Sequence, residues 1–375
     1  MEICSRCVLD TSIPNIRFDQ SQICNFCHSH DLLLISYPQD EAYLKSELEN
    51  LVLKIKKQGF KKPYDCIVGL SGGTDSTYTL WLTKQLGLRP LAVHLDDGWN
   101  SNIAVTNIKN ATQKLGVDLH THVLDWDEMK SIQVAWLKAS LPDACVPTDL
   151  AIHGALYKSA CQENLKFILG GQSFMTEGTQ PREWSYIDGT YLSSINKAHN
   201  NNRPLHTIPN ASIYKIGYYT FIKRIRQIPL LNYVKYTKED AKKIIANELD
   251  WQDYGGHHYE SKWTQFIVGF YNLKKFNIDR RKVSLSGSIR MGNITRDQAL
   301  QILKEPPEVS EELVDFCIKK VGLSREEWNK ILTLEPKNFL NYHSSYQTLK
   351  RFSWILRLAV KMDLVTPVLY EKYLG

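Results

Sequence analysis

The chain has 375 residues, of which 43% are hydrophobic and 23% are charged, as is typical of a globular protein with two or three domains. No apolar run approaches the length of a membrane span and the N-terminus lacks a signal-peptide pattern, so we expect a cytoplasmic protein without a membrane partner. The formal net charge of +6 is modest and suits small anionic substrates at least as well as nucleic acid. Eight cysteines in that compartment argue for metal ligands or free thiols, and against a disulfide framework.

Two C-x-x-C pairs near the N-terminus predict a metal-binding module over residues 1–35. The four cysteines are Cys4, Cys7, Cys24 and Cys27. Two such pairs can present four thiolates to one tetrahedral Zn²⁺. A module of this size has too little core to fold alone, so the metal would supply the folding energy. We expect His28 and His30 to lie outside the zinc shell. The alternatives are four unconnected cysteines or a redox pair.

Residues 64–83 form the most informative stretch of the chain. An apolar, β-branched run at 66–70 predicts a buried parallel strand, and an apolar pattern at 77–86 predicts a helix. The polar turn between them is Ser71-Gly72-Gly73-Thr74-Asp75-Ser76. Glycines let backbone N–H groups approach a phosphate closely, and the following helix start adds positive potential. The stretch therefore predicts an anion site. A serine- and glycine-rich turn without a ligand is the alternative.

This turn lacks the lysine that closes a G-x-x-x-x-G-K-[ST] loop, and it does not match G-x-G-x-x-G either. Ser71, Thr74 and Ser76 can donate hydroxyl hydrogen bonds to phosphate oxygens. Asp75 would repel bare phosphate, so its presence predicts Mg²⁺ between the carboxylate and the phosphate.

Alternating helices and apolar strands predict a doubly wound parallel α/β sheet over residues 36–249. The expected helices lie at 40–57, 103–115, 129–138 and 149–164, and the expected further strands at 90–95, 119–124 and 165–169. Nucleotides bind at the carboxyl ends of such strands. This places His94, Asp96 and Asp97 at one strand end and Gly170-Gly171 at another, although a solvated turn also explains the acidic pair.

Residues 172–206 are rich in Gly, Pro, Ser and Tyr and predict a long functional loop over the pocket. Its candidates for substrate or metal contact are Glu177, Arg182, Glu183 and Trp184, with exposed loop residues as the alternative. Beyond it we expect a helix at 212–226, a strand at 230–236 and a helix through 248 capped by Thr237.

Residues 250–375 predict a mainly helical substrate or partner region. A Gly-Gly turn precedes His257, His258 and Glu260, a combination that favours a site over plain structure. The basic patch around Lys275 and Arg281 is either part of the substrate site or a solvated face.

The S-G-G-x-D-S turn resembles the loop of the ATP pyrophosphatases, also called the PP-loop family. The flanking motifs narrow this to a resemblance to the N-acetyl sugar amidotransferases of surface-polysaccharide (LPS O-antigen) and nonulosonic-acid pathways. These motifs are GLSGGTDST at 69–77, VHLDDGWNS at 93–101, ILGGQSFMTEG at 168–178, PREW at 181–184, DYGGHHYES at 253–261 and KKFNIDRRK at 274–282. Two positions depart from the family pattern: His257 replaces a lysine, and Ser284 replaces a histidine.

The resemblance implies a PP-loop (HUP-like) fold and an ATP-dependent, AMP- and pyrophosphate-forming reaction in which an acetamido group becomes an acetamidino group. It implies ATP and Mg²⁺ as cofactors beside Zn²⁺, and ammonia from a separate glutaminase subunit, since the chain carries no recognisable glutaminase signature. Pattern and resemblance together assign catalytic roles to Asp75, Ser71, His258 and Glu260, with Asp75 holding Mg²⁺. The ATP-binding residues would be Leu70, Ser71, Gly72, Gly73, Thr74, Asp75, Ser76, His94, Asp96, Asp97, Gly170 and Gly171. The substrate-binding residues would be Glu177, Arg182, Glu183, His257, His258, Lys275 and Arg281.

Two other functions compete with this hypothesis. Several PP-loop enzymes that act on tRNA carry cysteine pairs, so tRNA thiolation is the enzymatic alternative. The modest net charge and the lack of an evident basic RNA-binding domain weigh against it. A zinc-ribbon interaction protein with a nucleotide-sensing domain is the other, but it leaves the long loop and the DYGGHHYES turn unexplained.

Overall fold

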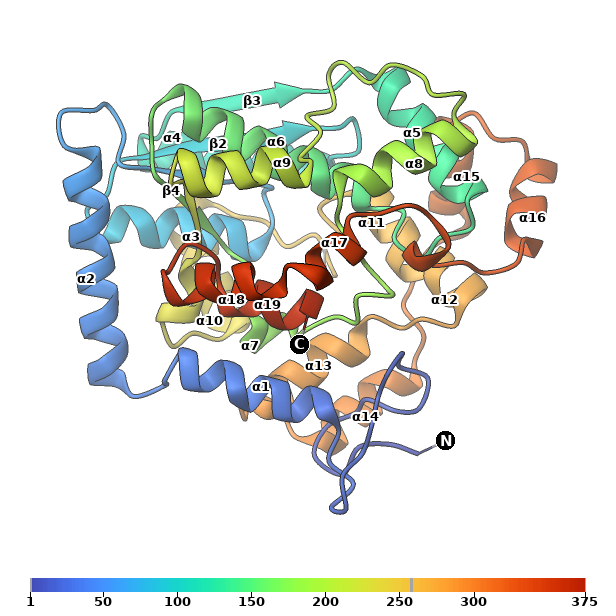
Figure 1. The fold of residues 1–375 in the computed structure, drawn as a ribbon, viewed down its shortest axis with the longest axis horizontal. Coiled ribbons are helices and arrows are strands. Elements are labelled where there is room, and N and C mark those ends of the chain that lie inside the picture. Colours follow the sequence, from blue (N-terminus) through green and yellow to red (C-terminus); the bar gives the residue numbers. More distant parts are fainter. Residues whose placement is uncertain (1, 257–258, 375) are drawn as a thin grey trace.

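A five-stranded parallel sheet organises the fold in the computed structural model, which describes residues 2–256 and 259–374 (Figure 1). The strand order is β3-β2-β1-β4-β5. The strands are β1 (Cys66–Gly69), β2 (Pro90–Asp96), β3 (Leu119–Val123), β4 (Phe167–Gly170) and β5 (Arg226–Pro229). Ile67 of β1 pairs with Leu91 of β2 on one side and with Ile168 of β4 on the other. The predicted doubly wound parallel sheet is confirmed.

The chain reverses direction across the sheet at the boundary between β1 and β4. It runs from β1 outward to β2 and β3, and then returns to β4 and β5 on the other side of β1. In open α/β sheets the crevice at such a boundary, beyond the carboxyl ends of the strands, is where ligands bind. The turn after β1 and the Gly-Gly turn after β4 both reach this crevice.

Apolar side chains on β1 alternate between the two faces of the sheet, and a separate core covers each face. Val68 belongs to a core that includes residues of α2, α3, α4 and α10, whereas Ile67 packs with Leu156 of α6. The helices from the N-terminus to α10 are α1 (Asn25–Ser36), α2 (Glu41–Gly59), α3 (Thr74–Gln85), α4 (Asn102–Leu115), α5 (Trp126–Lys138), α6 (Val146–Gln162), α7 (Phe174–Glu177), α8 (Gly189–His199), α9 (Ile213–Gly217) and α10 (Lys238–Leu249).

Three expected element boundaries were wrong. The last strand is β5, four residues before the expected start at 230, because Leu230 and Leu231 bury their side chains from a 3-10 turn instead. The expected helix at 212–226 is short and continues as a π-helix, Tyr218–Ile222. Helix α3 starts at Thr74, before the expected residue 77, so Asp75 lies in its first turn, where the helix dipole favours a carboxylate.

Residues 172–206 contain two helices, α7 and α8, so the prediction of one irregular loop was wrong. Asp188 caps α8 by accepting from the backbone N–H groups of Thr190 and Tyr191. Tyr191 and Ile195 then bury themselves in the largest core, which compensates for the weak helix propensity of this stretch.

The C-terminal region is helical, as expected. Its helices are α11 (Lys262–Phe266), α12 (Asn272–Phe276), α13 (Arg281–Arg290), α14 (Arg296–Lys304), α15 (Glu311–Lys320), α16 (Arg325–Thr333), α17 (Tyr346–Arg351), α18 (Ser353–Lys361) and α19 (Pro367–Leu374). Trp263 of α11 lies against Trp99, with ring centroids 5.0 Å apart, and both belong to one core. The core therefore crosses the domain boundary expected at 249/250, and that division stays a prediction.

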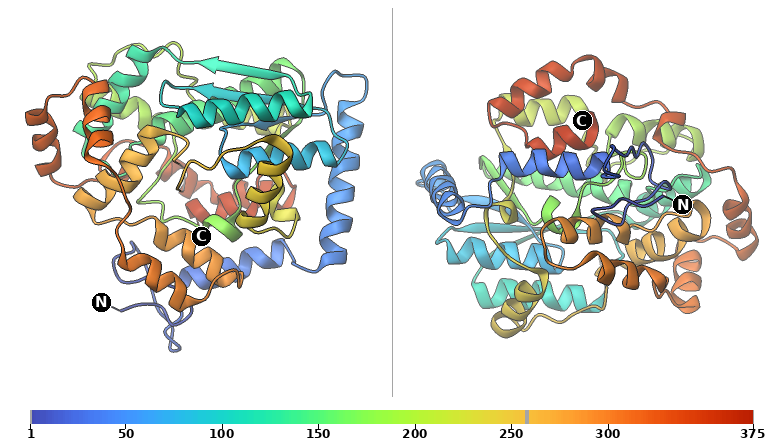
Figure 2. Two further views of the ribbon diagram at one scale, coloured as in Figure 1. Left: turned by 180° about the vertical axis from the view of Figure 1, so that it is seen from behind. Right: turned by 90° about the horizontal axis from the view of Figure 1, so that it is seen from below.

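The N-terminal cysteine module lies beside α13 and α14 (Figure 2). Val283 of α13 and Trp184 pack into its small apolar core. The Lys282 ammonium group pairs with the buried carboxylate of Asp10 at 2.6 Å. The module is thus attached to the C-terminal helices as well as to the chain that follows it. Among the described residues, no helix is long and apolar enough to cross a membrane.

Candidate functional site

The turn after β1 is held in a shape that only glycine permits at residue 72. Gly72 has φ of +80°, and a Cβ there would lie 2.4 Å from the backbone oxygen of Ala104. Its own carbonyl oxygen accepts hydrogen bonds from the Trp251 indole (3.0 Å) and the Asn107 amide (3.2 Å). Gly73 is the N-cap of α3. The turn and the helix start therefore form a pre-organised anion cradle.

Hydroxyl groups line this cradle. The Ser71 backbone N–H donates to the Ser76 hydroxyl at 3.1 Å, and the two serine hydroxyls lie 3.0 Å apart. The Thr74 backbone N–H, at the start of α3, donates to the Tyr254 hydroxyl at 3.1 Å. Tyr254 belongs to the DYGG turn, so this motif closes over the phosphate loop in the structure.

Asp75 is paired with a lysine from a distant part of the chain. Its Oδ2 lies 3.0 Å from the Lys238 ammonium group, and its Oδ1 accepts a hydrogen bond from the Tyr236 hydroxyl at 3.4 Å. The same Tyr236 hydroxyl lies 3.2 Å from the Thr176 hydroxyl of α7. In this structure the cation beside Asp75 is Lys238, and the role of Asp75 as a Mg²⁺ ligand stays a prediction. Sequence reasoning missed Lys238, because it treated 237–248 only as a capped helix.

Lys238 remains charged although it is half-buried. Burial by itself lowers the pKa of the ammonium group, but Asp75, and after it Glu177 and Glu260, outweigh that effect, so the net pKa lies above its usual value. Of the predicted site residues, Asp75 contacts this ammonium group directly, and the charges of Glu177 and Glu260 contribute to its raised pKa.

Glu260 reaches the phosphate loop from the C-terminal region. A Cβ at Gly73 would lie 2.9 Å from its Oε1, so the carboxylate rests directly on the loop. The Ser101 backbone N–H donates to the Glu260 carbonyl at 2.9 Å, and Asn100 forms an isolated antiparallel β-bridge with Ser261. These backbone bonds fix Glu260 beside the turn that follows β2. The neighbouring candidates His257 and His258 lie outside the described residues.

The residues at the end of β2 differ in how available they are. Burial lowers the pKa of His94, so its ring is neutral; Nδ1 lies 2.9 Å from the Leu70 carbonyl oxygen, and Nε2 lies 3.1 Å from the Asn100 amide nitrogen. Burial raises the pKa of Asp97, whose carboxylate accepts from the Thr148 hydroxyl and the Trp99 backbone N–H. Asp97 therefore stabilises its own turn, while Asp96 faces Asn100 at the strand end.

Only glycine fits at residue 171, where the turn after β4 meets the phosphate loop. A Cβ at Gly171 would lie 2.7 Å from the backbone carbonyl of Asp75. Ser173 then caps the short helix α7, which carries Thr176 and Glu177 toward Tyr236 and Lys238. The ends of β1 and β4 thus meet at the predicted crevice.

The remaining predicted substrate residues have structural partners. The Lys275 ammonium group donates to the carbonyls of Ile331 and Leu334 at the end of α16, both at 2.6 Å. Arg281 pairs with Asp279 at 2.7 Å.

Arg182 and Glu183 also have partners within the chain. Arg182 binds Glu183 at 3.1 Å and the Tyr373 carbonyl at 3.3 Å, and Glu183 also accepts a hydrogen bond from the Asn15 amide. These contacts give a structural reason for each residue, and their roles toward substrate stay predictions without support from this geometry.

The four N-terminal cysteines converge on one point. Their sulfur atoms lie within 4.8 Å of one another, with Cys4–Cys27 at 3.9 Å and Cys7–Cys24 at 3.7 Å, and all four are buried. The Arg290 guanidinium of α13 donates to Cys27 Sγ (3.2 Å) and Cys7 Sγ (3.5 Å). Such donors stabilise thiolates, so the cluster could hold a metal ion. As expected, the two nearby histidines are not part of this ligand group: His28 pairs with Asp19, and His30 packs on Phe174.

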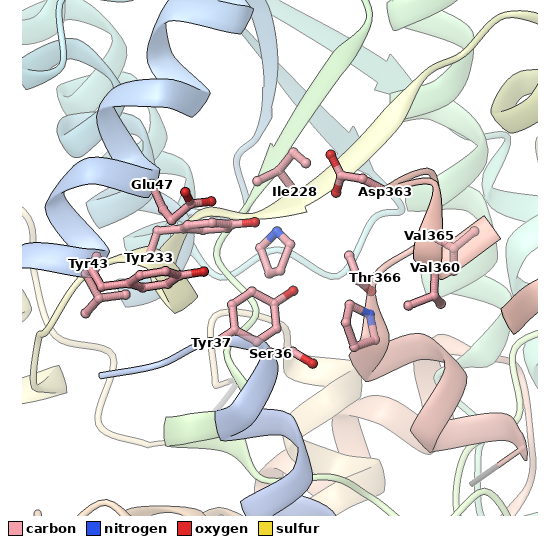
Figure 3. Close-up of a pocket in the computed structure, with 13 residues that line it drawn as sticks. Ser36, Tyr37, Tyr43, Glu47, Ile228, Tyr233, Val360, Asp363, Val365 and Thr366 are labelled. Carbon is pink, nitrogen blue, oxygen red and sulfur yellow. The ribbon is translucent and has the colours of Figure 1, made fainter. Parts of the chain in front are cut away.

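A separate cavity of about 190 Å³ lies between α1, α2, β5 and the C-terminal helices (Figure 3). Tyr37, Tyr233 and Glu47 line it, as do Asp363 and Thr366. None of the predicted site residues lines this cavity, so we distinguish it from the phosphate loop.

Comparison with known proteins connects the C-terminal region to a biosynthetic family. Residues 260–355 match the family model described as "LPS biosynthesis protein WbpG-like, C-terminal domain". The match agrees with the resemblance to LPS biosynthesis proteins over these residues, and the amidotransferase reaction stays a prediction. The match includes Glu260, the carboxylate that rests on the phosphate loop, and the KKFNIDRRK motif. An uncharacterized protein of Methanocaldococcus jannaschii is 24% identical over 322 residues, which is 83% of this chain and 97% of that protein.

Three solved structures are also similar to this chain at low identity. An NMN synthetase from Francisella tularensis is 13% identical, with a TM-score of 0.33, and covers 80% of this chain and 98% of its own. A U34-tRNA thiolase from Methanococcus maripaludis is 14% identical, with a TM-score of 0.34, and the match covers 86% of this chain and 98% of the thiolase. An NH₃-dependent NAD synthetase from Campylobacter jejuni is 13% identical, with a TM-score of 0.30, and the match covers 73% of this chain and 100% of the synthetase. Likeness at this level does not decide the activity of the chain.

Proposed function

We propose that the protein is an ATP-dependent amidotransferase that converts an acetamido group of an N-acetyl sugar into an acetamidino group. The observation that carries this proposal is the glycine-shaped turn between β1 and α3, set beside Glu260 of the WbpG-like domain. An anion cradle could bind the phosphates of ATP, and the family match favours a surface-polysaccharide sugar as the substrate. An enzyme that consumes ATP for this purpose would act in the cytoplasm.

The chemistry fits the groups at the site. The amide oxygen of the sugar attacks the α-phosphorus of ATP, and pyrophosphate leaves. Ammonia then adds to the activated carbon, and AMP departs with the former amide oxygen to give an amidine. The backbone N–H groups and hydroxyls of the loop would stabilise the negative charge on the departing pyrophosphate. We assign Glu260, whose carboxylate rests on the loop, as the general base that would accept a proton from the attacking ammonia.

Mg²⁺ prefers oxygen ligands, and Asp75 offers a carboxylate in the first turn of α3 beside the loop, with the Glu260 carboxylate next to Gly73. Asp75 would hold the ion, which supplies charge neutralisation on the phosphates when it is bound. The Lys238 ammonium group forms an ion pair with the Asp75 carboxylate in the structure, so it would leave this carboxylate when the Mg²⁺ ion binds.

Zinc suits the cysteine module best. A tetrahedron with metal–sulfur bonds of about 2.3 Å places its sulfur atoms about 3.8 Å apart. The three closest sulfur pairs here are 3.7 to 3.9 Å apart. A cluster of several iron and sulfide ions needs its cysteines farther apart than a single ion does. We therefore propose one structural Zn²⁺ on Cys4, Cys7, Cys24 and Cys27.

Ammonia would come from a separate glutaminase subunit. A glutaminase nucleophile needs an accessible thiolate. Burial raises the pKa of Cys145 to about 12, and it raises the pKa of Cys317 to about 12 as well. Burial in β1 raises the pKa of Cys66 further still. These three thiols are therefore poor nucleophiles, and Cys161, the fourth cysteine outside the cluster, lacks the glycine-rich turn of a glutaminase nucleophile.

Mass spectrometry tests the proposed reaction directly. Acetamido sugars are incubated with the protein, ATP and ammonium, and amidation replaces an oxygen atom by NH in the product. The same reaction should release AMP and pyrophosphate and should proceed with glutamine only when a glutaminase is added. Accumulation of ADP, or robust glutamine hydrolysis by the isolated chain, would refute the proposal. Copurification of tRNA, with thiolated tRNA as the product, would favour the alternative function.

A further inference from the structure

We propose that Lys238 is the phosphate-contacting cation of this loop: it holds Asp75 while the site lacks ATP, and it contacts the pyrophosphate portion of ATP once Asp75 takes up Mg²⁺. The inference rests on the proposed use of ATP and adds a residue that binds the leaving group. Lysine-containing phosphate loops carry this group within the loop sequence. Here the loop has none, and a helix more than a hundred residues away brings the ammonium group to it.

Lys238 is held by a rigid element. It is the first residue of α10, directly after the cap Thr237, whose hydroxyl accepts from the Asp240 backbone N–H at 3.1 Å. Ile245 and Leu249 of the same helix are buried in the core beneath α3. The ammonium group therefore reaches Asp75 from a fixed base, with Tyr236 on the other oxygen of the carboxylate.

The charges around Lys238 favour movement toward an incoming phosphate. Its ammonium group lies 3.0 Å from the Asp75 carboxylate, and the Glu260 carboxylate rests on Gly73, so two carboxylates share the mouth of the anion site with one ammonium group. A triphosphate can bind beside these carboxylates only if cations screen its negative charge from theirs. Mg²⁺ on the carboxylates and the ammonium group on phosphate oxygens would satisfy both kinds of charge at once.

A structural ion pair between α3 and α10 is the competing explanation, and the chain offers a matched control. Lys242 lies one turn further along α10 and pairs with Asp253 at 2.9 Å. Its side chain is 32% exposed, against 27% for Lys238. If both lysines only hold α10 in place, their removal should have the same kind of effect. The proposal requires that Lys238 alone changes the binding of ATP.

The experiment measures binding of α,β-methylene-ATP, which cannot be split at the reacting bond, together with thermal melting. We expect Lys238→Met to weaken binding by about tenfold to a hundredfold, as the loss of one charge-assisted hydrogen bond would. Lys242→Met should bind as the wild type does. Lys238→Arg should melt like the wild type, because it keeps the pair with Asp75, and should recover only part of the affinity and turnover.

The outcomes separate this inference from the proposed function. Wild-type affinity in a folded Lys238→Met protein would overturn the role of Lys238 and leave the amidotransferase proposal intact. If Lys238→Met fails to fold, the arginine variant decides: full recovery of both affinity and turnover would show a purely structural pair. A wild-type protein that binds neither α,β-methylene-ATP nor inorganic pyrophosphate would overturn both proposals.

Discussion

The cysteine module and the phosphate site are built in opposite ways. All four cysteines of the module come from residues 4–27, and two local turns bring them together. The candidate phosphate site instead collects Asp75 from α3, Lys238 from α10 and Glu260 from the region that matches the WbpG-like model. A local site can be recognised from residue spacing, whereas a site assembled from several elements depends on the whole fold. The two sites should therefore respond differently to substitution.

Removal of two metal ligands should have the largest effect. Cys4→Ser combined with Cys24→Ser leaves too few thiolates for a tetrahedral ion, and a structural zinc site contributes about 10–16 kcal/mol of apparent binding free energy. Metal analysis should fall from about one ion per chain to none, and thermal melting should show loss of the module. Cys161→Ser, outside the cluster, is the matched control. Metal retained in full by the double variant would show that these cysteines are not the ligands.

Asp75→Asn should abolish most of the activity and leave the fold intact. The amide keeps the shape of the side chain and its contact with Tyr236, and the residue lies in a first helical turn at the edge of the core. Turnover should fall by about two to four powers of ten, since metal charge stabilisation contributes several kcal/mol. The requirement for Mg²⁺ should also rise.

Asp96→Asn provides the comparison for Asp75→Asn. Asp96 accepts a hydrogen bond from the Gly98 backbone N–H within its own turn, so its substitution should lower turnover less. Both variants are titrated with Mg²⁺ at saturating ATP, and AMP formation is measured. Near-normal turnover of the Asp75 variant, with unchanged Mg²⁺ dependence, would place the metal on other residues.

Arg290→Met should weaken the metal site without destroying it. Its guanidinium donates to two of the four sulfur atoms, and loss of such outer contacts costs about tenfold to a hundredfold in metal affinity. Competition with a chelator measures the change. Arg17→Met serves as the control, because the side chain of Arg17 is exposed on the same module. Equal affinities in the two variants would mean that the sulfur contacts of Arg290 contribute nothing.

The smallest effect is expected at His94. Burial lowers its pKa, so the unfolded chain binds a proton more readily than the folded one. The stability that depends on neutral His94 is present above the ordinary histidine pKa of about 6.5, and it declines as the pH falls below that value toward the folded pKa. Urea unfolding between pH 5 and about 7 should show this slope, and His94→Gln should flatten it. An unchanged slope in the variant would assign the pH dependence to other groups.

The parts of the fold that sequence predicted are those with a local signal. β1, the glycine turn and α3 follow one another directly, and the cap Thr237 marks its helix. Helix α8 also carried a signal that was overlooked, because Asp188 is a good cap and Leu192 and Ile195 follow at helical spacing. Its many tyrosines and serines suggested a loop instead.

Other features had no signal that a single sequence could supply. Nothing in the residues around Lys238 indicates that its ammonium group meets Asp75, since the contact depends on how α10 packs on α3. Lys275 shows the reverse error. A basic cluster suggested substrate contact, but the free carbonyls at the end of α16 take its hydrogen bonds. Charge alone does not reveal whether a partner is a ligand or another part of the chain.

The hydrogen bond from the Trp251 indole to the Gly72 carbonyl gives the phosphate loop a built-in optical label. The indole is buried and touches Tyr254, with ring centroids 5.6 Å apart, and the Tyr254 hydroxyl accepts from the Thr74 backbone N–H. A nucleotide phosphate that takes this N–H must displace the hydroxyl and change the polarity around the indole. The emission of Trp251 should therefore follow nucleotide arrival in real time, and a Trp251→Phe protein would identify its share of the signal.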